Sequence, residues 1–169
     1  MTKAIAKLTA LLLLALNLAA CGFQLSAADS SLLAPLKGQQ VSVQGLDAKN
    51  SFVKKLVAAL EGAGATLVTE STQATLKLTL NRLEENKTAT AYSAARQVRE
   101  FNHFIDLSFS AESSAHSTAK PLSSSIHVER NQIYDSRYVL GVSEEERSIQ
   151  AELETEAARL LALRLAALR

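Results

Sequence analysis

The sequence predicts an α+β domain, in which a small, mostly antiparallel sheet of about four strands has two helices packed on one face. Several segments alternate apolar and polar residues, which is typical of half-buried strands. Two other segments repeat their apolar residues at the helical period. The order along the chain is strand, helix, strands, helix, and this order favours helices gathered on one face of a sheet.

The first strand and helix come directly after an irregular N-terminal region. Residues 40–46 alternate and predict a short strand. Asn50 or Ser51 can cap a helix over 52–61, where an apolar stripe repeats and glycines follow. Residues 65–68 then allow a brief strand before a turn. This part of the chain is therefore expected to form one strand–helix unit with a short extension.

The second half contains the longer strands. Residues 74–80 alternate most regularly, and the polar stretch 81–97 continues that strand, forms a loop, or does both. Residues 98–111 and 122–134 predict two further strands. The turn-like segment between these two strands is rich in serine.

The last element is a helix that runs to the C-terminus. Ser143–Glu146 has the pattern of a capping box, with three carboxylates where the positive end of the helix dipole favours them. Arg164 and Arg169 complement the opposite end. The sequence therefore predicts that the helix starts at Ser143.

The N-terminus has the features of an export signal. Lys3 and Lys7 precede an apolar run over 8–18, which is too short to cross the ~30 Å hydrocarbon core of a membrane. Small residues then lead to Cys21, and the whole pattern resembles a bacterial lipoprotein signal. Cys21 is the only cysteine, so it has no disulfide partner within the chain. The alternative is an ordinary signal peptide that contains a cysteine by chance.

This resemblance divides the chain into a signal peptide at 1–20, a lipidated tether at 21–39 and the α+β domain at 40–169. It implies a covalent diacylglycerol and an N-acyl chain on Cys21, and no other cofactor. Gly22 occupies the position where an aspartate commonly signals retention in the inner membrane. By the same resemblance, the mature protein is expected to be anchored in the outer membrane.

Composition and motifs exclude several classes of function. Removing residues 1–20 leaves 16 basic residues, of the 18 in the full chain, against 17 acidic ones, a balance that argues against nucleic-acid binding. The chain contains no Gly-x-Ser-x-Gly, His-Glu-x-x-His or phosphate-binding glycine motif, so no enzyme is expected. His103, His116 and His127 are dispersed without ligand spacing, so no metal site is expected either.

Several segments of the mature chain together carry a family resemblance. The mature chain opens with Cys21-Gly22-Phe23-Gln24-Leu25, and Tyr134-Asp135 comes shortly before an acid-rich helix start. The final helix carries Ala157-Ala158-Arg159-Leu160. These features, and the order of elements along nearly the whole mature chain, resemble the LptE family of lipopolysaccharide-assembly lipoproteins, whose members combine an aromatic-Asp pair with an acidic last helix.

The resemblance implies a non-enzymatic role. LptE-like proteins plug the lumen of the LptD β-barrel in a one-to-one complex, stabilise it, and contact lipopolysaccharide (LPS) on its way to the outer leaflet. The expected location is therefore the periplasmic side of the outer membrane and the barrel lumen. Two alternatives remain: a lipoprotein that binds a lipid, such as an auxiliary component of a lipid transporter, and a purely structural envelope lipoprotein.

The resemblance also directs attention to two groups of residues. Lys87, Arg96 and Arg99 surround the junction of two central strands and are candidates for binding LPS phosphates; the alternative is that they are solvated hairpin charges. Arg130, Tyr134, Arg137 and Tyr138 are candidates for the interface with the barrel. The alternatives are arginines paired with local acids and tyrosines that cover the final helix.

Overall fold

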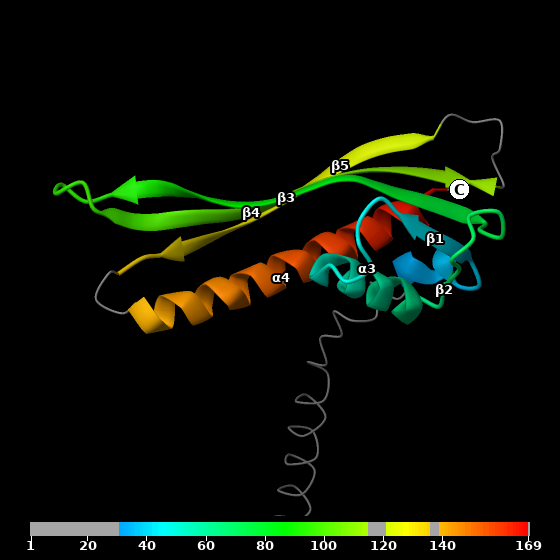
Figure 1. Ribbon diagram of the computed structural model, residues 1–169, viewed down its shortest axis with the longest axis horizontal. Coiled ribbons are helices and arrows are strands. Elements are labelled where there is room, and N and C mark those ends of the chain that lie inside the picture. The colour runs from blue at the N-terminus through cyan, green and yellow to red at the C-terminus, as the bar shows by residue number, and fades with distance from the viewer. Residues whose placement is uncertain (1–30, 115–120, 136–138, 169) are drawn as a thin grey trace, which may run out of the picture. The chain divides into compact units, whose positions relative to one another are not determined.

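The computed structural model describes residues 31–114, 121–135 and 139–168 of the 169-residue chain. The chain divides into two units, Met1–Ser31 and Leu32–Arg169, and the second unit contains the sheet and the helices that pack on it. The strands form one open sheet in the order β2-β1-β3-β4-β5. The helices lie against one face of this sheet (Figure 1), which confirms the α+β class.

The first part of the sheet is parallel. β1 (Gln40–Gln44) pairs in parallel with both β2 (Thr66–Leu67) and β3 (Leu76–Tyr92). The helix α3 (Ser51–Gly62) connects β1 to β2. Such a crossover connection allows β2 to run in the same direction as β1. The expectation of about four mostly antiparallel strands was therefore wrong, because the sheet is mixed and has five strands.

Two local predictions in this region are confirmed, and one helix was missed. The side chain of Asn50 caps α3 by accepting hydrogen bonds from the backbone N–H groups of Phe52 and Val53, at 2.9 and 3.4 Å. The short 3-10 helix η1 (Ala34–Leu36) adds a third helix to the two expected. Leu36 is 1% exposed, so the core begins within the segment that the sequence assigned to the tether.

The second part of the sheet is antiparallel and long. β3 pairs with β4 (Val98–Ser113), and β4 pairs with β5 (Leu122–Ile133). The polar stretch after residue 80 therefore continues the strand as far as Tyr92. Register shifts after Leu80 and after Ala89 mark irregularities in the β3–β4 ladder. The hairpin extends beyond the start of the last helix (Figure 1).

The last helix, α4, spans Val139–Ala166. It begins one turn before the predicted capping box, so the prediction that Ser143 starts the helix was wrong. The preceding residues contain no proline, and a single glycine inside a helix costs only about 1 kcal/mol, so nothing prevents the extra turn. The carboxylates at 144–146 are therefore free to meet side chains of neighbouring elements.

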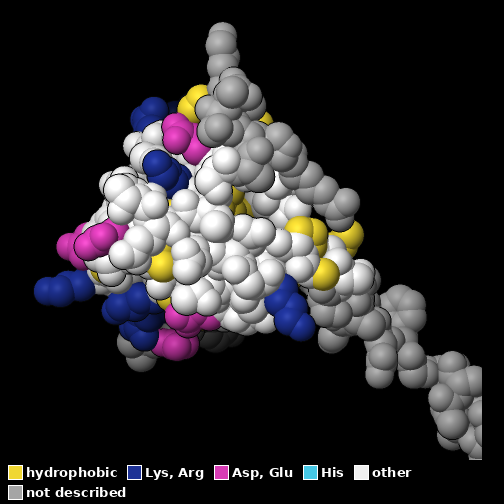
Figure 2. All heavy atoms as spheres, turned by 90° about the vertical axis from the view of Figure 1, so that its right-hand side faces the viewer, with side chains coloured by type: hydrophobic (Ala, Val, Ile, Leu, Met, Phe, Trp, Pro, Cys, Tyr) yellow, Lys and Arg dark blue, Asp and Glu magenta, His cyan; other side chains and the backbone are white. Residues whose placement is uncertain are grey.

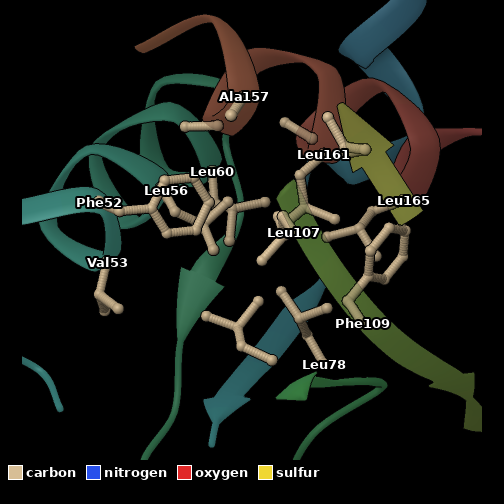
Figure 3. Close-up of a cluster of buried hydrophobic side chains, with 14 of the residues drawn as sticks. Phe52, Val53, Leu56, Leu60, Leu78, Leu107, Phe109, Ala157, Leu161 and Leu165 are labelled. Atoms are coloured by element: carbon tan, nitrogen blue, oxygen red, sulfur yellow. The ribbon is translucent and has the colours of Figure 1, made fainter. Parts of the chain in front are cut away.

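The apolar core fills the space between the helices and the sheet (Figure 3). Side chains of α3, α4, β3 and β4 point toward one another there, and the largest are less than 2% exposed. They include Phe52, Leu56, Leu60, Leu78, Leu107, Phe109, Leu161 and Leu165. Toward the N-terminus of α4, the last described side chain of this core is that of Ile149. The turns of α4 before it therefore meet the sheet through other contacts.

Candidate functional site

The structure places the three predicted basic residues at different positions around the β3–β4 hairpin. Lys87 lies within β3, paired in register with His103. Arg96 lies in the turn that joins the two strands, and Arg99 is the second residue of β4. All three are exposed. They therefore share one hairpin but do not form a single cluster.

Lys87 is held by two contacts on the side of the sheet that faces α4. Its ammonium lies 2.6 Å from a carboxylate oxygen of Glu146 in α4. It also lies 4.9 Å from the centre of the Phe101 ring, within the range of a cation–π interaction. Lys87 is thus positioned by its neighbours while 42% of its side chain stays exposed.

Arg96 has an unusual backbone conformation. Its φ is +60°, the left-handed region that residues with a Cβ seldom adopt. The turn is closed by hydrogen bonds in which the N–H of Ser93 donates to Gln97 and the N–H of Arg96 donates to Ser93, at 2.8 and 2.9 Å. The turn therefore presents an arginine where a glycine would be less strained.

Tyr134, a predicted interface residue, packs against the hairpin. Its ring meets Phe101 edge to face, with centroids 5.3 Å apart, and its backbone N–H donates to the carbonyl of Arg99 at 2.9 Å. Phe101 thus lies between Tyr134 and the ammonium of Lys87. The end of the β3–β4 hairpin that lies beyond the main core is called the distal hairpin. The pair of Phe101 and Tyr134 gives it a small apolar contact of its own.

An open cavity of about 570 Å³, largely accessible to solvent, lies between β3, β4 and the first turns of α4. It is lined almost entirely by polar side chains: Glu85, Asn86, Lys87, His103, Ser143, Glu146, Arg147 and Gln150. Two of these are acids, and Lys87 and Arg147 are cations beside the histidine, so cationic and anionic groups face the same space. A ligand of this cavity would need polar or charged groups.

One wall of the cavity is fixed by a chain of hydrogen bonds. His103 is 5% exposed, and its Nε2 lies 2.9 Å from the side-chain oxygen of Gln132 in β5. The amide nitrogen of Gln132 donates to Glu145 of α4 at 3.1 Å. Because the amide nitrogen of Gln132 faces Glu145, the amide oxygen faces His103, and this oxygen can only accept a hydrogen bond. The proton of His103 is therefore on Nε2. This chain connects three elements without apolar packing.

The floor of the cavity approaches a second polar cluster. The amide of Gln150 donates to Glu85 at 2.6 Å. Burial raises the pKa of Glu85, and the nearby carboxylate of Glu154 raises it further, while Lys55 acts in the opposite direction. Glu85 is therefore protonated more readily than a free glutamate, although part of its side chain is exposed.

Arg130 lies on the edge strand β5, next to the C-terminal half of α4. The pKa of Glu156 is lowered, first by its hydrogen bond from Arg159 and further by the positive charge of Arg130. The alternative in which Arg130 meets local acids thus has support in the structure. Arg130 is nevertheless exposed and remains accessible to a partner.

The opposite face of the sheet carries polar residues that alternate with the buried ones. On this face, His127 of the edge strand β5 lies 2.8 Å from Asp106 and 3.4 Å from Glu129. Asp106 raises the pKa of His127 through its hydrogen bond, and Glu129 adds to the effect, against a smaller opposing contribution from burial. This face is therefore hydrated and charged.

Some predicted residues lie outside the described part of the chain, namely Cys21, Arg137, Tyr138 and His116. Within the described residues, no group of three acidic, histidine or cysteine side chains is arranged to hold a metal ion. None of the helices described is both long and apolar enough to span a bilayer.

Sequence reasoning missed the partners of Lys87 and His103. Glu146 is 59 positions from Lys87, and Gln132 is 29 positions from His103. The period of two placed His103 on the buried face, and that was the available signal for a polar contact there. The spacing of the charges gave no indication of which acid meets which base.

The fold is similar to that of several solved bacterial lipoproteins. Rare lipoprotein B from Shewanella oneidensis is similar, with a TM-score of 0.64 and 16% identity over 74% of this chain and 93% of that chain. A lipoprotein B from Nitrosomonas europaea gives 0.66 and 14%, over 78% and 84%. A minor lipoprotein from Acinetobacter baumannii gives 0.62 and 14%, over 76% and 91%.

The chain belongs to the LptE lipopolysaccharide-assembly family, whose model matches residues 38–165. A search of curated proteins by sequence found no match. The family assignment gives the protein a role in lipopolysaccharide assembly, and the match covers every strand and nearly all of α4.

Proposed function

We propose that this protein is an outer-membrane lipoprotein that plugs and stabilises the LptD β-barrel in a one-to-one complex and assists LPS assembly at the cell surface. In this proposal, diacylglycerol and an N-acyl chain on Cys21 provide the anchor, and the protein has no catalytic role. The observation that carries the proposal is the family match over residues 38–165. Stable anchoring needs two acyl chains or more, in line with such a modification.

The surface supports insertion into a hydrated lumen. Barrel interiors are lined by polar side chains, and the open face of the sheet is rich in serine, asparagine and charged residues between the buried positions of β4 and β5. On the end of the molecule seen in Figure 2, basic and acidic side chains lie near one another and apolar ones are scattered. Such a surface can exchange hydrogen bonds with a lumen wall.

The distal hairpin supports contact with LPS, which carries phosphates. Lys87, Arg96 and Arg99 are exposed on it, and charge-assisted hydrogen bonds to phosphate are among the stronger polar contacts. The alternative function, binding of a lipid in an apolar pocket, has less support. The cavity between β3, β4 and α4 is polar, and the apolar side chains pack into a filled core.

Copurification tests the proposal. The full chain, expressed in its native envelope and extracted with detergent, is expected to copurify with one LptD barrel per molecule. Cys21→Ala should lose acyl labelling and membrane attachment. As a control for destination, Gly22→Asp should keep the acyl chains but remain in the inner membrane. Recovery of the lipidated protein without any barrel would contradict the proposal.

A further inference from the structure

We infer that Glu146 competes with LPS phosphate for Lys87, so that the ion pair between β3 and α4 acts as a latch on the polar cavity. This inference rests on the proposed function, because it concerns the regulation of the same LPS contact. Lys87 is the basic residue of the three predicted ones that already has an acid as its partner.

The geometry puts the acid where a ligand anion would bind. Lys87 and Glu146 both line the cavity, and their charged groups are 2.6 Å apart. Their side chains are 42% and 31% exposed, so an anion in solution can reach both. An anion that enters the cavity therefore meets an ammonium that is already neutralised, next to a carboxylate that repels it.

The contact can be exchanged because the described contacts at this end of α4 are polar. Among the side chains that the structure describes, the apolar core ends at Ile149, and the contacts before it run from Glu145 to Gln132 and from Glu146 to Lys87. A solvent-exposed ion pair contributes only about 0.2–1 kcal/mol. A phosphate group, with more charge than a carboxylate, can therefore displace Glu146 without disturbing the core.

Lys87 would stay in place after Glu146 leaves. Its ammonium lies over the ring of Phe101, which in turn packs edge to face on Tyr134. Arg147 lies one residue beyond Glu146, lines the same cavity, and pairs with Glu144 at 2.5 Å through an exposed contact. Release of the latch thus leaves a pre-positioned ammonium with a second cation nearby, a combination that suits a phosphate.

The test measures binding of purified LPS to the full chain in detergent. Glu146→Gln is expected to bind about twofold to fivefold more tightly than the wild type, which is the strength of an exposed ion pair. Glu146→Ala should give the same gain and guards against an effect specific to the amide. Glu152→Gln, which removes an equal charge from an exposed position on the same helix, should leave the affinity unchanged.

Three further measurements test what causes this gain in affinity. It should disappear when Lys87→Met is combined with Glu146→Gln, when dephosphorylated LPS is the probe, and at about 1 M salt, where exposed charges are screened. If the wild type binds LPS but neither Glu146 variant binds more tightly, the latch is wrong and the proposed function stands. If no form of the protein binds LPS, the latch and the proposed contact with LPS are both wrong, whereas the proposed role as a barrel plug is tested separately by copurification.

Discussion

The carboxylate of Glu154 in α4 lies 2.8 Å from the ammonium of Lys55 in α3. The side chain of Glu154 is 6% exposed, whereas that of Lys55 is 30% exposed. The other carboxylate oxygen of Glu154 accepts a hydrogen bond from the hydroxyl of Ser51. Two partners from α3 thus compensate a buried charge on α4, and they fix how the two helices pack.

Replacing Glu154 should therefore destabilise the fold. We expect Glu154→Ala to lower the free energy of unfolding by about 1–3 kcal/mol, because it removes the acceptor from Ser51 and Lys55 while Lys55 can turn toward water. Urea unfolding followed by circular dichroism measures the change. Glu152→Ala, on the exposed side of the same helix, should stay within about 0.5 kcal/mol. Equal effects of the two variants would contradict the prediction.

Among the glycines in the part of the chain that the structure describes, Gly45, directly after β1, has the least room for a side chain. Its φ is +101°, and a Cβ there would overlap the carbonyl oxygen of Leu80 in the neighbouring strand. We expect Gly45→Ala to cost at least about 2 kcal/mol, since it combines a strained backbone with a clash against main-chain atoms. Gly62→Ala is the matched control, because a Cβ at Gly62 meets nothing within 4 Å.

The control should have the opposite sign. Gly62 ends α3 in a helical conformation, and alanine in a helix is favoured over glycine by about 0.5–1 kcal/mol. Thermal unfolding of both variants measures whether Gly45→Ala lowers the stability and Gly62→Ala raises it. A Gly45→Ala protein as stable as the wild type would show that β1 and β3 do not approach each other as described.

The His127–Asp106 pair predicts a dependence of stability on pH. Asp106 raises the pKa of His127 in the folded protein above its ordinary value of about 6.5. Below that value the histidine is charged in both states and the pair contributes fully. The contribution is lost as the pH rises through the folded pKa. Because His127 is exposed, we expect it to amount to less than about 1 kcal/mol.

The measurement compares wild type and His127→Gln by urea unfolding at about pH 6 and about pH 9. At the lower pH the wild type should be more stable than His127→Gln. This difference in the free energy of unfolding should be smaller at the higher pH. In an Asp106→Asn background, where the main cause of the raised pKa is absent, the change with pH should be smaller. A difference that is the same at both pH values would refute the role of this pair.

Local patterns in the sequence predicted the elements well but not their pairing. The alternation after residue 74 and the cap at Asn50 were sufficient for β3 and α3, because both depend on neighbouring residues. The parallel pairing of β1 is a contact between distant segments, and β2 has only two residues, too few for a period to identify. The start of α4 was misplaced because a capping pattern is also compatible with a helix interior.

The candidate site was predicted in composition but not in geometry. The family resemblance directed attention to residues 87–99, and the structure places Lys87, Arg96 and Arg99 in exposed positions on one hairpin. The bond from Lys87 to Glu146 could not be predicted, because it depends on how far α4 extends beneath the hairpin. Whether Lys87, Arg96 and Arg99 bind LPS stays a prediction, and Arg96 offers the cleanest test of it.

Arg96 allows charge and stability to be separated. A left-handed conformation costs a residue with a Cβ about 1–2 kcal/mol, and glycine adopts it without that cost. We therefore expect Arg96→Gly to be as stable as the wild type or more stable by up to about 1 kcal/mol. The same variant removes one of the proposed phosphate contacts. We expect its affinity for LPS to fall by about tenfold, the value of one hydrogen bond to a charged group.

These two effects have opposite signs, so a loss of LPS affinity in Arg96→Gly cannot be attributed to unfolding. Arg96→Lys is the matched control, because it keeps both the positive charge and the strained backbone, and it should retain most of the affinity. Binding of LPS by titration and the melting temperature are measured on the same preparations. If Arg96→Gly is stabilised and still binds LPS as the wild type does, the arginine serves another purpose. If it is destabilised, Arg96 makes contacts that offset its backbone strain.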